Sequence, residues 1–196
     1  AVGFYQHLPI ENPESLLDLE IEPPRPAGRD LLVEVKAVSV NPVDTKRRAA
    51  GARPSTGLKI LGWDAAGVVV AAAPQARLFK PGDKVYYAGS NQRPGANSQL
   101  HLVDERIVGR KPTNLSFPEA AALPLTTITA WEAMFERMGI SKSGADRGKL
   151  LLILGGAGGV GSIAIQLAKK LGRLAVIASA SRPDSIAWVR GLGADA

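Results

Sequence analysis

The sequence predicts a mixed α/β protein with two domains: an all-β domain over residues 1–122, and the first part of a doubly wound parallel sheet over residues 123–196. Two observations lead to this prediction. Up to about residue 115, short strand-like segments alternate with Gly/Pro turns, which is typical of a compact β-barrel or sandwich. Beyond that point, longer helical patterns alternate with continuous apolar runs of strand length, as they do in βαβ units.

The strands of the first domain are indicated by alternation and by turn residues. In residues 31–40, LLVEVKAVSV, the pattern places Val33, Val35 and Ala37 on the inward face. The stretch KPGD at residues 80–83 suits a type II turn, with Pro and Gly at its central positions. Further strands are expected at residues 65–73, 84–87 and 99–103.

The second half begins with helical signals. Ser116 and Glu119 have the spacing of a capping box, which predicts a helix that starts there. Residues 129–138 are helical in pattern, and a polar, Gly-containing connection follows. The apolar run at residues 150–154 then predicts a fully buried parallel strand.

A glycine cluster, GGAGGVG at residues 155–161, follows this strand directly and fits the GxGxxG pattern. A helix is expected next, with Gly172 as its C-terminal cap and a second strand at residues 174–178. The residues predicted to form its apolar face are Val160, Ile163, Ala164, Leu167, Ala168 and Leu171. Strand, glycine turn, helix and strand together make one βαβ unit.

In this context the pattern indicates a dinucleotide-binding turn. The first glycine, Gly156, would permit the tight turn, Gly158 would let the backbone approach a pyrophosphate, and Gly161 would let the helix pack against the strand. The helix N-terminus would direct its N–H groups at the phosphates. The residues expected at the cofactor are Gly156, Ala157, Gly158, Gly159, Val160 and Gly161. The alternative is a Gly-rich turn without a ligand.

The end of the second strand favours NADPH over NADH. An NAD site places an acidic residue there for the ribose hydroxyls, but no acid occurs before Asp184. Ser179, Ser181 and Arg182 stand there instead, and a guanidinium with two hydroxyls suits a 2′-phosphate. The alternative is that these are ordinary polar loop residues.

Composition limits the remaining classes of function. The chain has 196 residues, 45% of them apolar, and no run long enough to span a bilayer or form a signal peptide, so a cytoplasmic globular protein is expected. Without cysteine it has neither a thiolate nucleophile nor a Cys-based zinc site. The net charge of +6 is spread along the chain without a nucleic-acid motif, so it favours an anionic small molecule over a nucleic acid.

Several segments in a fixed order resemble one family across nearly the whole chain. They are VEVKAVSVNPVDTKRR (33–48), ILGWDAAGVV (60–69), FKPGDKVY (79–86), LPLTTITAWEAMF (123–135), GGAGGVGSIAIQLAK (155–169) and VRGLGAD (189–195). The chain is similar to the medium-chain dehydrogenase/reductase superfamily, in its quinone oxidoreductase or zinc-type alcohol dehydrogenase-like branch. This resemblance implies a GroES-like β-barrel followed by a Rossmann domain, with Thr127 near the nicotinamide and a possible homodimer through the Rossmann domain.

The resemblance also allows the zinc site to be tested by position. The matches to the family's catalytic ligands are Asn41, Trp63 and Leu123, none of which supplies a thiolate or an imidazole. The Cys-rich structural lobe is replaced by SNQRPGAN, residues 90–97. His101 is expected at the surface, on the polar face of its strand. No metal is therefore expected.

Without zinc, hydride transfer to a quinone or an α,β-unsaturated carbonyl is favoured, because conjugation spreads the developing charge. The predicted catalytic residues are Asn41, which would hydrogen-bond substrate or nicotinamide, Asp44, which would orient the NPVD turn, and Lys46, which stands where relatives often carry Tyr. For Asn41 and Asp44 a purely turn-stabilising role is an equal alternative.

The rest of a Rossmann domain is expected to lie on a longer protein, since residues 150–196 suffice for only one βαβ unit and the start of another helix. The predicted reductase activity belongs to that longer protein, and this chain alone is expected to be inactive. Two other interpretations stay open. This chain could be a catalytically silent NADPH-binding or structural piece, or part of an alcohol dehydrogenase-type carbonyl reductase.

Overall fold

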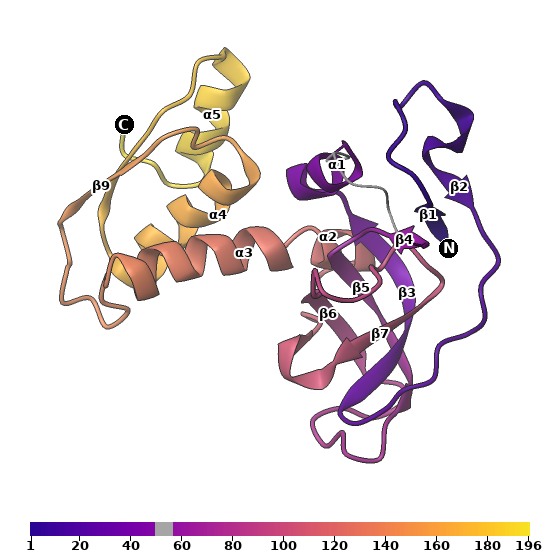
Figure 1. Cartoon of the computed structure of the whole chain (residues 1–196). Helices are drawn as coiled ribbons and strands as arrows, with labels where there is room; N and C mark the ends of the chain where they lie inside the picture. The colour runs from indigo at the N-terminus through magenta and orange to yellow at the C-terminus, as the bar shows by residue number, and fades with distance from the viewer. Residues whose placement is uncertain (50–56) are drawn as a thin grey trace. The chain divides into compact units, whose positions relative to one another are not determined.

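The structure, a computed structural model, describes residues 1–49 and 57–196. The chain divides into two compact units, Ala1–Leu125 and Thr126–Ala196 (Figure 1). The division falls inside helix α3 (Pro124–Trp131). No helix in the described part of the chain is both long enough and apolar enough to cross a membrane.

In its described residues, the first unit is built around a five-stranded antiparallel sheet with the strand order β7-β3-β5-β6-β8. These strands are β3 (Asp30–Ser39), β5 (Asp64–Ala72), β6 (Lys84–Ala88), β7 (Leu100–Asp104) and β8 (Val108–Arg110). A smaller antiparallel sheet with the order β2-β1-β4 consists of β1 (Val2–Phe4), β2 (Leu17–Asp18) and β4 (Lys59–Ile60).

The predicted strands and turn of this unit are confirmed. Val33 is fully buried, whereas Val35 and Ala37 are only half-buried because the pairing of β3 with β5 shifts register between them. Such a bulge interrupts the two-residue alternation. In the KPGD turn, Asp83 N donates to Lys80 O at 3.1 Å and Gly82 has φ +93°, the geometry of a type II turn.

Short helices complete the first unit: η1 (Pro13–Ser15), α1 (Pro42–Ala49), η2 (Glu105–Ile107) and α2 (Phe117–Ala121). The predicted capping box is present, since Ser116 Oγ accepts from Glu119 N and the Glu119 carboxylate accepts from Ser116 N at 2.8 Å. The core lies against the large sheet and includes Leu31, Val33, Val69, Val85, Tyr87 and Val103.

The second unit contains one parallel strand pair, β9 (Leu150–Ile153) and β10 (Ala175–Ala178), connected by helix α4 (Gly159–Leu167). This confirms the predicted βαβ unit. Helix α4 continues as the π-helical turn η4 (Ala168–Gly172), α3 continues as η3 (Glu132–Arg137), and α5 (Pro183–Gly191) follows β10. The core consists chiefly of Met134, Phe135, Leu151, Ile165, Leu174, Val176 and Val189.

Residues 195 and 196 hydrogen-bond along β10. Asp195 N donates to Val176 O and Ala178 N donates to Ala196 O, each at 2.8 Å. The Asp195 carboxylate also accepts from Val176 N at 2.7 Å and pairs with Lys169 Nζ at 2.8 Å. The final residues therefore satisfy backbone groups of β10 that β9 does not reach.

Three predictions for the second unit were wrong in detail. Strand β9 is parallel but not fully buried: Leu150 and Leu152 are 65% and 59% exposed, because only its other face packs on the core. On α4, Val160 is exposed whereas Ile165, outside the predicted face, is fully buried. The helix is terminated not by Gly172 but by Arg173, which adopts the left-handed conformation with φ +54°.

Candidate functional site

The glycine cluster forms a tight turn between β9 and α4. Gly155 has φ +68°, a left-handed conformation that favours glycine. Gly158 N donates to Gly155 O at 3.0 Å, and Ser162 N donates to Gly158 O at 2.8 Å, which begins the helix. The tight turn therefore depends on Gly155 and not, as predicted, on Gly156.

Gly156 and Gly161 serve close packing instead. A Cβ on Gly156 would lie 2.8 Å from Ala178 Cβ, and one on Gly161 would lie 2.7 Å from Gly155 O. Gly161 thus lets the helix approach the turn, whereas the prediction had it approach the strand. Gly158 is more open, since its nearest neighbour would be Gly155 O at 3.3 Å, so a ligand has room to approach the backbone there.

The N-terminus of α4 has no side-chain cap. Its N-cap residue, Gly158, is extended (φ −74°, ψ 169°) and carries no side-chain oxygen that could accept from the first-turn amides. Such amides, with the positive end of the helix dipole, attract anions. The turn can therefore bind a phosphate group, because it offers free backbone N–H donors as well as room for the ligand.

A cavity of about 430 Å³ opens beside this turn. Its lining includes Ala157 and Gly158 from the turn, and Ser179, Ser181 and Arg182 from the segment after β10. Ser179 connects the two segments, since its Oγ accepts from Gly155 N at 2.8 Å and its carbonyl accepts from Gly156 N at 2.9 Å. The structure thus brings two of the residues predicted for the phosphates together with the residues predicted for the ribose 2′-phosphate. The other predicted turn residues do not line this cavity: Gly156, Gly159, Val160 and Gly161.

Helix α3 also lies beside the turn. A Cβ on Gly159 would lie 3.0 Å from Thr126 Cγ2. The predicted residue, Thr127, is the half-buried next residue on this helix. The position of Thr127 at a nicotinamide stays a prediction, and Thr126 is the neighbour of the turn that the sequence did not indicate.

In the first unit, three polar side chains form a buried cluster. Asn41 Nδ2 donates to Asp64 Oδ2 at 2.9 Å, and Asn41 N donates to Asp44 Oδ2 at 2.8 Å. Asp44 Oδ1 accepts from Gly62 N at 3.1 Å, so it joins α1 to the segment before β5. Leu125 N donates to Asp64 Oδ1 at 2.8 Å. These contacts fix the orientation of the Asn41 carboxamide.

Asp64 is the member of this cluster that the sequence did not indicate. It is fully buried at the start of β5, and burial raises the pKa of its carboxyl to about 6. The nearby Asp44 raises this pKa further, while the hydrogen bonds from Asn41 and Leu125 lower it. Its only signal in the sequence was a charged residue that opened an apolar strand.

Lys46 lies apart from this cluster. It is exposed on α1, two residues after Asp44, and its side chain forms no ion pair with a described residue. Its predicted catalytic role remains untested, and the structure gives it no contact with Asn41 or Asp64.

Comparison with known proteins identifies the family. The family described as Alcohol dehydrogenase GroES-like domain matches residues 27–124. A Staphylococcus epidermidis zinc-type alcohol dehydrogenase-like protein is 44% identical over 196 residues, all of this chain and 57% of that protein. A 2-methylene-furan-3-one reductase from Solanum lycopersicum is 40% identical over 84% of this chain and 43% of its own length.

Two solved structures agree. A Rhizobium etli protein assigned to the zinc-dependent alcohol dehydrogenases is 57% identical with a TM-score of 0.92, over 100% of this chain and 57% of that one. The quinone oxidoreductase of Escherichia coli, complexed with NADPH, is 31% identical with a TM-score of 0.81. The match covers 98% of this chain and 56% of that one. The chain belongs to the medium-chain dehydrogenase/reductase superfamily. It spans 57% of the length of its Staphylococcus epidermidis relative.

Zinc does not fit the side chains of this dehydrogenase/reductase chain at the three matching positions. Asn41 already donates its Nδ2 to Asp64, and Trp63 and Leu123 have an indole and an alkyl side chain. Among residues 1–49 and 57–196, no three His, Asp or Glu side chains are grouped so that they could hold a metal ion. These residues are poor zinc ligands, although several relatives carry a zinc-type name.

The prediction that His101 lies at the surface of this dehydrogenase/reductase chain was wrong. His101 is buried, because the loop that contains residues 90–97 covers it. Its Nε2 donates to Pro94 O at 3.0 Å and its Nδ1 accepts from Tyr87 OH at 2.9 Å. Burial lowers the pKa of His101 to about 4. His101 is a core residue and neither a surface group nor a metal ligand.

Proposed function

We propose that the protein is a zinc-independent oxidoreductase that transfers a hydride from NADPH to a quinone or an α,β-unsaturated carbonyl. The observation that carries the proposal is the hydrogen bond from Asn41 to buried Asp64, where zinc-dependent relatives are expected to place a metal ligand. An amide held by a carboxylate can orient a substrate or nicotinamide by hydrogen bonds, but it does not supply a Lewis acid.

For the cofactor, the turn at residues 156–161 would hold the pyrophosphate, and Ser181 and Arg182 would hold the 2′-phosphate. When bound, NADPH would supply the hydride. None of the residues that line this cavity is acidic, so the usual carboxylate partner of an unphosphorylated ribose is missing. This composition favours NADPH over NADH.

At the acceptor, Asn41 would be the catalytic residue. Because Asp64 takes one Nδ2 hydrogen, the other hydrogen and Oδ1 are left for reactants. Asp44 would be a positioning residue, since it holds the Asn41 backbone and Gly62. A quinone or enone suits such a site, because conjugation spreads the charge that a zinc ion would otherwise stabilise. The Solanum lycopersicum and Escherichia coli relatives, named for an enone and a quinone, support this acceptor class.

The cofactor proposal is tested by initial rates of NADPH and NADH oxidation with 1,4-naphthoquinone. We expect NADPH to be preferred about tenfold or more, and Arg182→Ala to remove most of that preference while leaving the NADH rate unchanged. Arg190→Ala, in helix α5, which begins directly after Arg182, lies outside the cavity and is the matched control. Equal rates with both cofactors in the wild type would refute the NADPH assignment.

The zinc-free proposal is tested by elemental analysis together with the rate of Asn41→Ala. We expect no tightly bound zinc, and a rate at least about tenfold lower in the variant. One zinc per chain, retained through dialysis, would support a carbonyl reductase of the alcohol dehydrogenase type instead. An unchanged rate in Asn41→Ala would remove this residue from the mechanism.

A further inference from the structure

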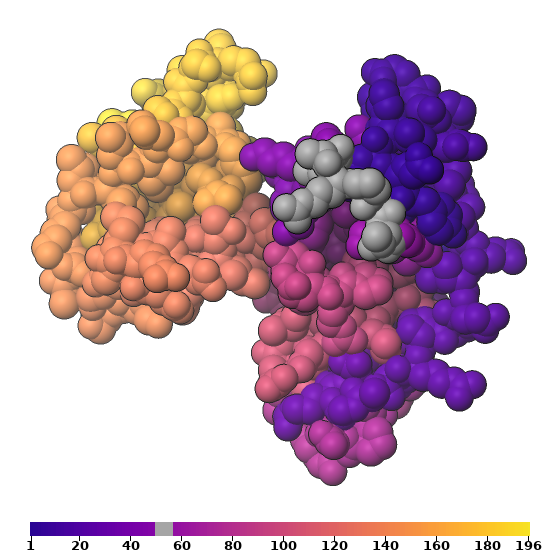
Figure 2. All heavy atoms as spheres, viewed as in Figure 1, coloured from indigo at the N-terminus to yellow at the C-terminus, as the bar shows by residue number. Residues whose placement is uncertain are grey.

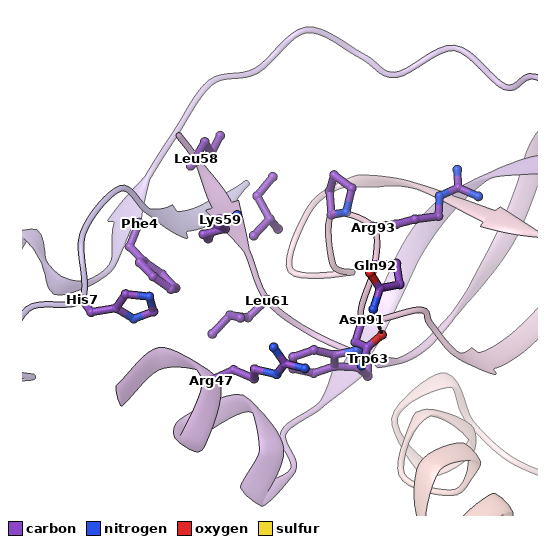
Figure 3. A pocket seen from close by; sticks show the side chains of 12 residues that line it. Phe4, His7, Arg47, Leu58, Lys59, Leu61, Trp63, Asn91, Gln92 and Arg93 are labelled. Atoms are coloured by element: carbon purple, nitrogen blue, oxygen red, sulfur yellow. Dashed lines mark hydrogen bonds between the residues drawn. The ribbon is translucent and has the colours of Figure 1, made fainter. Parts of the chain in front are cut away.

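A cavity of about 360 Å³ lies within the first unit (Figure 3). Two of its lining residues come from the same stretches of chain as the buried cluster of Asn41, Asp44 and Asp64. Arg47 projects from α1, three residues after Asp44, and Trp63 directly precedes Asp64. In Figure 3 the Arg47 side chain extends from α1 toward the Trp63 indole. The cavity lining therefore includes chain neighbours of the residues proposed to orient the substrate.

All the ionised side chains in the cavity lining are positively charged. Arg47, Lys59 and Arg93 line it, and none of its lining residues is Asp or Glu. Arg93 is neutralised by a bidentate pair with Asp30 at 2.7 and 2.9 Å. Arg47 and Lys59 form no ion pair with any residue in the described ranges. Two cations that have no ion pair among the described residues, with an indole in the same cavity lining, suit an organic anion that carries a planar group.

The opposite wall is held in place. Loop residues Gly95, Ala96 and Asn97 donate backbone N–H groups to the carbonyls of residues 60–62 at 2.8–2.9 Å. The pair between Arg93 and Asp30 attaches the same loop to the start of β3. The loop belongs to the stretch SNQRPGAN, which stands in place of the family's zinc-binding lobe. In this chain the stretch forms one side of a preorganised cavity.

We propose that this cavity binds the anionic group of the substrate, so that the preferred acceptors are quinones or enones that carry a carboxylate or sulfonate. Arg47 and Lys59 bind the anion, and Trp63 contacts the adjoining planar group. The inference rests on the proposed function for the reaction, but the binding of an organic anion to the cavity can be measured without turnover.

The first experiment measures binding by isothermal titration calorimetry with naphthalene-2-carboxylate and its neutral carboxamide. We expect the carboxylate to bind about fivefold more tightly. Arg47→Gln combined with Lys59→Gln should abolish this preference, and raised salt should weaken it. Lys84→Gln, which removes a cation outside the cavity, is the matched control. Equal affinities in the wild type, or a preference that survives the double substitution, would overturn the proposal.

The second experiment compares turnover of 1,4-naphthoquinone and a sulfonated naphthoquinone with NADPH. The double variant should raise KM about fivefold for the sulfonated acceptor only, with kcat unchanged. If neither quinone is reduced while the carboxylate still binds selectively, the proposed reaction fails and the anion site stands. If both are reduced with equal KM by wild type and variant, the reaction stands and the anion site fails.

Discussion

At the scale of single residues, the buried titratable groups are the features that the sequence indicated least. Asp64 and His101 lie in strands whose patterns predicted an apolar interior and an exposed polar face. Their burial depends on segments distant in the sequence: α1 supplies Asn41 to Asp64, and the loop before β7 supplies Pro94 O to His101. Patterns within a strand carry no information on such partners.

Asp64→Asn should change how stability depends on pH. The folded chain keeps the Asp64 proton up to about pH 6, whereas the unfolded chain releases it near 3.8, so wild-type stability falls as pH rises through this window. The full effect is about 3 kcal/mol. Asparagine does not titrate, so the free energy of unfolding of the variant, relative to wild type, should increase from pH 4 to pH 7 in urea titrations. A constant difference between the two proteins would contradict this prediction.

His101→Gln should show the opposite slope. Burial lowers the pKa of His101 to about 4. Between pH 6.5 and pH 4 the imidazole is therefore protonated in the unfolded chain but neutral in the folded chain. Wild-type stability therefore falls as pH decreases from 6.5 toward 4, by about 3 kcal/mol. The variant lacks this titration, so its free energy of unfolding in urea should lose that part of the pH dependence. Tyr87→Phe, which removes the hydroxyl but keeps the histidine, should retain the pH dependence.

At the scale of elements, the glycines of the turn before α4 have different roles. Gly156 and Gly161 allow close packing, whereas Gly158 leaves room for a ligand. The sequence predicted the turn, the helix and the parallel strands correctly, because their signals are local. It assigned the tight turn to Gly156 because the GxGxxG spacing alone does not say which glycine adopts positive φ. The close approach of Gly156 to Ala178 is long-range and appears only in the folded unit.

Gly161→Ala and Gly158→Ala should therefore have different effects. A methyl group on Gly161 would meet backbone atoms at 2.7 Å, so the variant should lose roughly 1–3 kcal/mol of stability in thermal or urea unfolding. On Gly158 the nearest atom would lie at 3.3 Å, which a small shift relieves, and alanine is a poorer N-cap than glycine, so the loss of stability should be smaller, about 1 kcal/mol or less, while NADPH binding weakens. Calorimetric titration with NADPH measures the second effect. Equal destabilisation by both substitutions would contradict the assignment.

At the scale of the whole molecule, the order of the two units and the family were predictable, whereas the exposure of β9 was not. The apolar run at residues 150–154 matches strands that are buried on both faces in complete parallel sheets. In this chain one face of β9 packs on the core and the other exposes Leu150 and Leu152, and Leu154, which follows the strand, is exposed as well. A sequence pattern indicates the environment for which a strand is suited, whereas its exposure depends on which elements pack against it.

This exposed face should cause self-association of the chain. We expect concentration-dependent dimers in sedimentation velocity, and Leu152→Lys should raise the dissociation constant about tenfold or more, because it places a charge on the apolar face. Val70→Lys, at an exposed valine of the first unit, should leave association unchanged. A monomer at all concentrations for wild type would refute this expectation.

The pairing of residues 195 and 196 with β10 limits a different kind of association, which runs through strand edges and not through the leucine face. A sheet can polymerise into a fibril only if it offers an unpaired edge on both sides, since each added copy must leave a new edge exposed. Here the hydrogen bonds of Asp195 and Ala196 occupy the outer side of β10. Edge-to-edge association through β9 would therefore close after two copies, as a twofold-symmetric pair, and would not propagate.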